Sequence, residues 1–183
     1  MKINLRPVTK EDGPMIVRWR NAPMVLAHCL NQEPITLESN DAFFQRHVLT
    51  GNYLQFIAEK QDEAAGISCP IATVYLKDID KTNKRCELCV FTADDQEWNT
   101  DSQGIAVKLL LQKAFVELQL HKVYAYAFYR FINEASLLKR AGFTMEAVLK
   151  EEVINAEGEY DDIVRFAITD KDWKTTVSQF QSI

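Results

Sequence analysis

The chain has 183 residues, of which 47% are hydrophobic and 26% charged, and its net charge at neutral pH is −5. This composition excludes a disordered polar chain, and the length fits one domain, residues 1–183, with its own core. The negative balance argues against a nucleic-acid binder held by phosphate contacts, and no apolar run is long enough to span a bilayer. Since the N-terminus has no apolar signal core, we expect a cytoplasmic protein without a membrane partner.

The N-terminal third predicts one strand and two capped helices. Residues 3–7 alternate like an edge strand. Thr9 to Asp12 has the form of a capping box, with a hydroxyl first and a carboxylate three residues later, and it precedes an apolar helix that stops near Pro23. A loop at residues 31–35 follows, and Thr36 caps the second helix.

The middle of the chain predicts a hairpin that leads into a crossover. Residues 53–60 and 70–77 are strand-like and are joined by a polar turn. Residues 85–91 form the next strand, and residues 98–106 a polar turn with one glycine. A helix and a Tyr- and Val-rich strand at 122–129 complete a parallel β-α-β unit. The apolar stripe of that helix is Val107, Leu110, Leu111, Ala114, Phe115 and Leu118.

The C-terminal part predicts a short helix, a long hairpin and an amphipathic tail. Gly142 ends the short helix, residues 143–149 form a strand, and residues 153–154 pair with 160–168 across a turn. The tail centres on Trp173. The predicted fold class is therefore α/β (α+β): a single mixed, twisted, mostly antiparallel sheet with a central parallel crossover and helices on both faces.

The four cysteines do not predict a metal site. Cys86 and Cys89 have C-x-x-C spacing, but residues three apart in a strand point to opposite faces. A zinc pair needs a turn that brings both thiolates to one ion. Buried, reduced cysteines are the favoured interpretation.

Three segments carry a resemblance to a known family. Asp101 to Ala106, Asn133 to Ser136 and Ala141 to Phe143, taken in this order, resemble the GNAT superfamily of acetyl-CoA-dependent N-acetyltransferases. The likeness runs from Leu5 to Trp173 and is most similar to the branch of the ribosomal-protein N-terminal acetyltransferases. Residues 151–162 resemble the closing hairpin of that branch.

The resemblance implies an enzyme that moves acetyl from acetyl-CoA, its co-substrate, to a primary amine by direct attack, without a metal or a covalent acyl-enzyme. The acceptor would be a protein N-terminus or a small amine such as an amino sugar or a polyamine. The oligomeric state is left open, a homodimer included. The alternative is a non-catalytic GNAT-like module that senses an acyl-CoA or binds a partner.

The resemblance also implies how the donor binds. A strand that parts from its neighbour would pair its free N–H and C=O groups with the pantetheine arm, and the N-terminus of the following helix would bind the pyrophosphate. The residues expected to bind the donor are Val90, Phe91 and Thr92 on the strand, Gln103, Gly104, Ile105 and Ala106 at the helix start, and Asn133 before the short helix.

The phosphate-binding turn departs from the family pattern. Such turns usually begin with Arg or Gln and hold more than one glycine, whereas this chain has Asp101 first and no basic residue from 94 to 107. A carboxylate there would cap the helix and repel phosphate, at a cost of about 1 kcal/mol. Weakened donor binding is expected rather than its loss.

The chemistry requires a group that takes a proton from the amine, because an ammonium with a pKa near ~10 has no lone pair. Glu87 is the candidate base, since a carboxylate in the middle of a strand is unfavourable unless it forms an ion pair or takes part in catalysis. An ion pair with a neighbouring cation explains it equally well. Ser136 is the candidate acid for the leaving thiolate, with Tyr129 as the fallback. A structural or solvated role is expected for the three histidines, His28, His47 and His121.

Five residues are candidates for acceptor binding. Trp19, Arg20 and Asn21 resemble a Trp-Arg-Asn segment of several branch members, including amino-sugar acetyltransferases. The simpler interpretation, favoured for the arginine, places Trp19 in the core and Arg20 in solvent. Gln32 and Glu33 lie in the loop that forms the acceptor wall in the family, and loop polarity explains them equally well.

Overall fold

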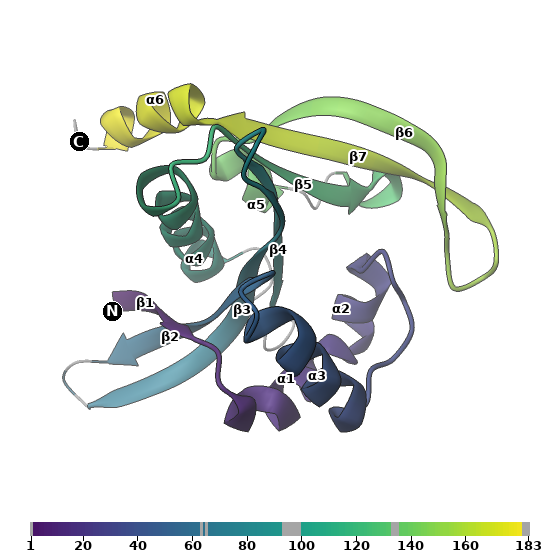
Figure 1. Ribbon diagram of the computed structural model, residues 1–183. Coiled ribbons are helices and arrows are strands. Elements are labelled where there is room, and N and C mark those ends of the chain that lie inside the picture. Colours follow the sequence, from purple (N-terminus) through teal and green to yellow (C-terminus); the bar gives the residue numbers. More distant parts are fainter. Residues whose placement is uncertain (1, 63, 65, 93–99, 133–135, 181–183) are drawn as a thin grey trace.

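The computed structural model describes residues 2–62, 64, 66–92, 100–132 and 136–180. Seven strands form one sheet in the order β1-β2-β3-β4-β5-β7-β6 (Figure 1). Their bounds are β1 Lys2–Pro7, β2 Leu54–Asp62, β3 Ile67–Asp80, β4 Arg85–Thr92, β5 Lys122–Phe128, β6 Thr144–Ile154 and β7 Tyr160–Thr169. Of the neighbouring pairs only β4 and β5 are parallel, which confirms the predicted fold class.

The helices differ from the predicted ones in two places. The α-helices are α1 Gly13–Arg20, α2 Pro23–His28, α3 Leu37–Phe43, α4 Asp101–Gln112, α5 Ser136–Arg140 and α6 Asp170–Phe180. The sequence did not predict α2, because Pro23, interpreted as a stop, is its first residue. The predicted turn at 98–106 is wrong from residue 101 onward, because Thr100 is the N-cap of α4.

The two faces of the sheet are covered by different helices (Figure 1). Val74, Leu76 and Leu88 point to one face and share a core with the predicted apolar stripe from Val107 to Phe115, whereas Leu118, also predicted for the stripe, is exposed at the end of the helical segment. Ile57 and Phe91 point to the other face, where they share a second core with Trp19 of α1 and its neighbours. In the described part of the chain no helix is long and apolar enough to cross a membrane.

The predicted capping box begins a 3₁₀ turn, Lys10–Asp12, which runs directly into α1. The Thr9 N–H donates to Asp12 Oδ2 at 2.8 Å, and the Arg6 guanidinium donates one hydrogen bond of 2.7 Å to each carboxylate oxygen of Asp12. Arg6 also donates to Glu59 of β2 at 2.7 Å. The edge strand, its neighbour and α1 are thereby tied together by one planar cation.

The parallel pair is unusually short. Only Arg85 to Glu87 pair with Lys122 to Tyr124, although β4 continues to Thr92 and β5 to Phe128. Beyond Glu87 the two strands diverge, while β3 stays paired with β4 as far as Thr92 and β7 stays paired with β5 as far as Phe128. The expected parting of the strands is present and begins at residue 88.

The β6–β7 hairpin reaches across this opening toward α2 (Figure 1). Its tip is a tight turn in which Asn155 Oδ1 accepts from the N–H groups of Glu157 and Glu159 at 3.0 and 2.9 Å. The Ala156 N–H donates to Gln32 Oε1 at 2.7 Å, and Gln32 Nε2 donates to the carbonyl of Ala27 in α2 at 3.1 Å. One glutamine side chain therefore joins the hairpin tip to α2.

Gly142 ends α5 with a positive φ of 97°. A Cβ at this position would lie 2.9 Å from Thr176 Oγ1 and 3.1 Å from Ile168 Cδ1, so α6 and β7 leave no room for a side chain. The turn needs glycine both for its backbone conformation and for the close contact.

We expect Gly142→Ala to lower the free energy of unfolding by at least ~2 kcal/mol, since left-handed strain and overpacking add. Gly51 is the matched control, because its φ is also positive, 75°, but a Cβ added there would meet nothing within 4 Å. Gly51→Ala should cost only about 1 kcal/mol. Urea unfolding of both variants measures the difference, and equal losses would contradict the packing argument.

Candidate functional site

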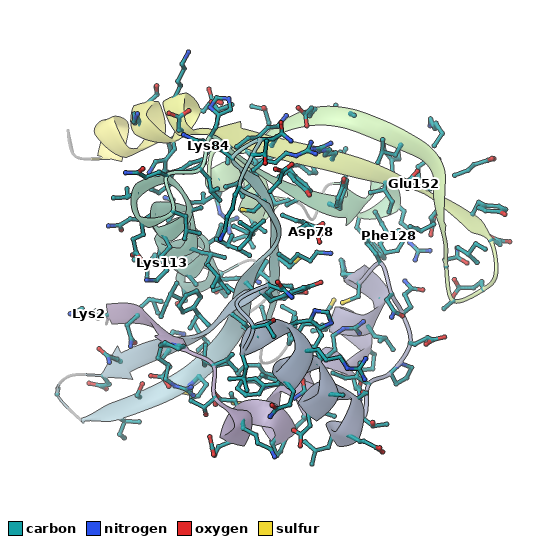
Figure 2. The ribbon with its side chains drawn as sticks, in the orientation of Figure 1. Lys2, Asp78, Lys84, Lys113, Phe128 and Glu152 are labelled. Carbon is teal, nitrogen blue, oxygen red and sulfur yellow. The ribbon has the colours of Figure 1, made fainter. Side chains whose placement is uncertain are left out.

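A cavity of about 340 Å³ occupies the space where β4 and β5 diverge. Arg20, Val25 and His28 line it from the α1–α2 face, and Gln103, Leu137 and Leu138 line it from the α4–α5 face. Phe128 of β5 lies on its wall, between that part of the sheet and α2 (Figure 2). Because the two sets of residues belong to opposite faces, the cavity extends between the two faces of the sheet, and it is called the passage below.

The diverging part of β4 forms one wall of this passage. Leu88, Cys89, Val90 and Phe91 all line it. In the described chain no ladder pair joins these residues to β5, so this edge of β4 is open to another extended molecule. Val90 and Phe91 thus lie where a pantetheine arm was expected, while the buried Thr92 is not among the lining residues.

Glu87 sits at the point where the strands part, and it is 6% exposed. Its Oε1 lies 3.1 Å from Lys77 Nζ and accepts a hydrogen bond from Cys89 Sγ at 3.2 Å. Burial by itself lowers the pKa of Lys77, but its neighbours Cys89 and Glu87 outweigh burial and raise the pKa above its ordinary value. Glu87 is therefore paired with a cation and also borders the passage.

The neighbouring thiol is not a nucleophile. Burial, with the charge of Glu87 adding to it, raises the pKa of Cys89 well above its ordinary value, so the thiol stays protonated. Burial likewise raises the pKa of Tyr75, which lies opposite Cys89 on β3. Cys86 points to the other face and is buried in the α4 core, as the strand alternation predicted. Among the described residues no group of three His, Cys, Asp or Glu side chains could hold a metal ion.

Because α4 starts at Asp101, the phosphate-binding N–H groups cannot be those of residues 104–106, as was expected. Thr100 Oγ1 accepts from the Gln103 N–H at 3.3 Å, and the Gly104 N–H donates to the Thr100 carbonyl at 3.0 Å. The amide groups of Gly104, Ile105 and Ala106, which were expected to face a pyrophosphate, are thus engaged inside the helix. The first N–H groups of the helix belong to residues 101–103, and that of Gln103 is already bound by Thr100. Asp101 is exposed in this first turn and is not the cap.

The acceptor candidates have separate environments. Trp19 is 3% exposed and packs in the core, as expected. Arg20 is not solvated as expected: it lines the passage, one terminal nitrogen donates to the Asn31 carbonyl, and the other, Nη1, is buried without a partner among the described residues. Asn21 holds the backbone of Ile35 with two hydrogen bonds of 2.7 and 2.8 Å.

The two loop candidates make contacts of different kinds, through the side chain of Gln32 and through the backbone of Glu33. Gln32 joins α2 to the hairpin tip, as described above. Glu33 is exposed, and its N–H donates to Asn31 Oδ1 at 3.0 Å. Neither is among the residues that line the passage.

The two acid candidates are each next in sequence to a residue that lines the passage, Leu137 and Phe128. Ser136 Oγ accepts from Arg140 at 3.3 Å, and Tyr129 is 47% exposed with the Lys150 ammonium 5.6 Å from its ring centre. Neither lines the cavity. Asn133 lies outside the described residues.

Several residues of the passage were not predicted, among them His28, Lys77, Cys89, Tyr126 and Phe131. The register of β3 against β4 places Lys77 opposite Glu87, and single-sequence reasoning does not give that register. His28 was missed as a site residue because α2 was not predicted. The strand alternation that places Cys89 on the same face as Glu87 was available in the sequence.

Comparison with known proteins agrees with this geometry. Residues 2–144 match the family described as an acetyltransferase (GNAT) domain. The spermidine N(1)-acetyltransferase of Escherichia coli strain K12 is 21% identical over 169 residues, which cover 91% of this chain and 85% of the relative.

Two solved structures have the same fold. The spermidine N-acetyltransferase of Vibrio cholerae in complex with CoA and spermine superimposes with a TM-score of 0.82 at 20% identity, covering 94% of this chain and 98% of the other. A chimera of that enzyme with hSSAT gives a TM-score of 0.78 at 20% identity, over 96% and 99%. These relatives do not support the expected placement in the ribosomal-protein branch. The family match over most of the chain nevertheless shows that the protein belongs to the GNAT acetyltransferases, which use acetyl-CoA as donor.

Proposed function

We propose that this acetyltransferase moves acetyl from acetyl-CoA to a small polycationic amine of the polyamine class. The observation that carries the proposal is the passage between the two faces of the sheet, because it gives donor and acceptor separate approaches to one point. The donor approaches from the α4–α5 face, and the acceptor from the α1–α2 face. The two meet beside Glu87, where β4 and β5 part.

The donor site uses the open edge of β4 and the start of α4. The amides of the pantetheine arm pair with the backbone at residues 88–91, and the pyrophosphate rests on the first N–H groups of α4. Asn133, Ser136 and Tyr129 remain predictions for contacts to the arm and for protonation of the leaving thiolate. Asp101 is exposed in the same first turn, and the expectation that it weakens donor binding remains a prediction.

Glu87 supplies the negative charge that the acceptor meets in the passage. Its Oε1 is held by Lys77 and Cys89, and in the described part of the chain no hydrogen bond reaches Oε2. We propose that Oε2 accepts a hydrogen bond from an N–H of the acceptor amine. A base role for Glu87, through a water molecule, uses the same contact.

The amine attacks the thioester carbonyl carbon once it has lost a proton. A C–N bond forms, the C–S bond breaks, and the coenzyme leaves as a thiol after the sulfur takes one proton. The products are the acetamide, free coenzyme A and one proton released to solvent.

The charge of the β6–β7 hairpin favours a polycation. Residues 144–162 hold seven carboxylates and one lysine, a surplus of negative charge larger than the whole net charge of −5. Glu151, Glu152, Glu157 and Glu159 have no ion pair among the described residues, and Glu152 points outward from the hairpin (Figure 2). The hairpin tip contacts α2 through Gln32, so this charge flanks the acceptor side. The relatives above are named for spermidine, a compound of this class.

A second acceptor class is favoured by Arg20. A guanidinium nitrogen that is buried without a partner among the described residues is costly, and an oxygen on the acceptor would satisfy it. A protein N-terminus or an amino sugar carries such an oxygen beside its amine, and a polyamine does not. These are the acceptors expected from the ribosomal-protein branch and from the Trp-Arg-Asn segment.

The acceptor is tested by release of free thiol from acetyl-CoA with spermidine, an amino sugar and a short peptide. We expect spermidine to have the highest kcat/KM, and its KM to rise between 0.1 and 1 M salt as the Debye length falls from about 10 to 3 Å. A higher kcat/KM for the sugar or the peptide than for spermidine would contradict the polyamine proposal. If Arg20→Gln then lowers that kcat/KM tenfold or more, the acceptor belongs to the second class.

We expect Glu87→Gln to lower kcat/KM for the acceptor by about 10²-fold and to change the Kd of acetyl-CoA less than about twofold. Lys77→Met should instead lower the free energy of unfolding by ~2 kcal/mol or more, because it leaves a buried carboxylate unpaired. The double variant should recover stability and stay inactive. Full turnover in Glu87→Gln would remove the residue from the mechanism.

We expect Asp101→Asn to tighten acetyl-CoA binding about fivefold, since one repelling charge near the phosphates is removed. Glu117→Gln is the control, because Glu117 is an exposed carboxylate at the other end of the same helical segment. It should leave the Kd of acetyl-CoA unchanged. Isothermal titration calorimetry measures both. No heat with any of the three proteins at millimolar acetyl-CoA would favour the non-catalytic module.

A further inference from the structure

Strand β3 contains a bulge directly after the residue that pairs with Glu87. The ladder between β3 and β4 is regular up to the Lys77–Glu87 pair, and it resumes at Asp80. Two residues of β3, Asp78 and Ile79, therefore stand opposite a single residue of β4, which is the pattern of a β-bulge. Ile79 packs against the α4 core, so Asp78 is the extra residue.

Asp78 has a left-handed backbone conformation, with a φ of 50°. A bulge residue in this region is usually glycine, because a Cβ is strained there. Aspartate adopts the conformation more readily than most residues, but glycine adopts it without strain. A side chain present at a strained position beside a candidate site points to a function of that side chain.

The carboxylate of Asp78 lies beside the ion pair at the point where β4 and β5 part. Lys77 Nζ is 3.9 Å from Asp78 Oδ2 and 3.1 Å from Glu87 Oε1, so one ammonium contacts both carboxylates. Burial, with the charges of Glu87 and Asp78 adding to it, raises the pKa of Tyr124 on β5, which places both carboxylates near the same phenol. Figure 2 shows Asp78 beside β4, on the side where Phe128 of the passage wall lies.

The two carboxylates differ in how far solvent reaches them. The side chain of Asp78 is 59% exposed, whereas that of Glu87 is 8% exposed. In the described part of the chain no hydrogen bond reaches the Asp78 carboxylate, and Lys77 is the cation within ion-pair distance. An incoming cation therefore meets Asp78 before it meets Glu87.

We propose that Asp78 binds the second ammonium group of a diamine acceptor while the first amine lies at Glu87. The inference rests on the proposed function, since it names the residue that distinguishes a polyamine from a monoamine. Asp78 then determines specificity and takes no part in proton transfer.

The physical reason is the balance of charge at this end of the passage. Asp78 and Glu87 carry two negative charges, and the ammonium between them carries one positive charge. The next charged residues of the same hairpin, Asp80 and Arg85, pair with each other at 3.4 Å and leave that balance unchanged. One further ammonium neutralises the group, and a diamine supplies it from the same molecule that brings the reacting nitrogen.

The proposal is tested with diaminopropane and propylamine, which share a three-carbon chain and differ by one amine. We expect the wild-type protein to have the higher kcat/KM with the diamine. Asp78→Asn, which keeps the shape of the side chain, should lower the diamine-to-monoamine ratio of kcat/KM about fivefold. The loss should appear in the KM of the diamine, because the second ammonium does not react.

Two controls separate the charge from the backbone. Asp62→Asn removes an exposed carboxylate where β2 turns into β3, at the opposite end of β3, and should leave the ratio unchanged. Asp78→Gly removes the carboxylate and the strain together, so it should lose the diamine preference with a urea midpoint no lower than that of the wild type. Gln119→Gly relieves a similar strain, at a φ of 52°, and should keep the preference.

Equal losses with both amines in Asp78→Asn would overturn the proposal, because an aspartate that only supports Lys77 or Glu87 affects every acceptor. A lower urea midpoint for Asp78→Gly with an unchanged ratio would overturn it as well, since the side chain then serves the fold.

Calorimetry with spermidine, with coenzyme A bound so that no acetyl is transferred, separates this inference from the proposed function. The Kd of spermidine should rise about fivefold in Asp78→Asn. Spermidine that binds in this way but is not acetylated from acetyl-CoA would contradict the proposed function and support the role of Asp78. Acetylation of spermidine with a Kd that does not depend on Asp78 would contradict this role alone, and absence of spermidine binding would overturn both.

Discussion

The structure depends on a parallel strand pair that is only three residues long. Parallel neighbours in a sheet normally keep their ladder until one strand ends, and both faces are covered by helices. Here β4 and β5 separate after Glu87 while each keeps its antiparallel partner on the far side. The sheet is therefore continuous on both sides of β4 and β5 and open between them, and Glu87, Val90 and Phe91 line the cavity at this opening.

An open seam inside a protein leaves backbone polar groups without ladder partners, which costs free energy unless something else pairs with them. The fold limits this cost by keeping the opening short and by covering it with α4 and α5 on one face and α1 and α2 on the other. Lys77, Glu87 and Cys89 form a group of cation, carboxylate and thiol at its apex, in which both partners contact Oε1 of Glu87. The charge at the apex is thus held in place before any substrate arrives.

Features that are local in the chain could be predicted, and features set by strand register could not. The capping box at Thr9, the cap at Thr36 and the apolar stripe from Val107 to Phe115 follow from spacing alone, and the structure contains them. Leu118 does not belong to the stripe as predicted, because it lies at the C-cap of the helical segment and is 38% exposed. The start of α4 was mispredicted because Gly104 and its polar neighbours resemble a turn, although Thr100 supplies the cap. Lys77 reaches Glu87 only through the pairing of β3 with β4, which requires the tertiary structure.

The side chain of Gln32 has a mechanical consequence. Its two amide atoms connect the tip of the β6–β7 hairpin to the backbone of α2, one residue before His28. Because both hydrogen bonds belong to one side chain, the hairpin tip cannot separate from the end of α2 without breaking one of them. The acidic hairpin and a helix that lines the passage are therefore fastened to each other, although 124 residues of chain lie between Gln32 and Ala156.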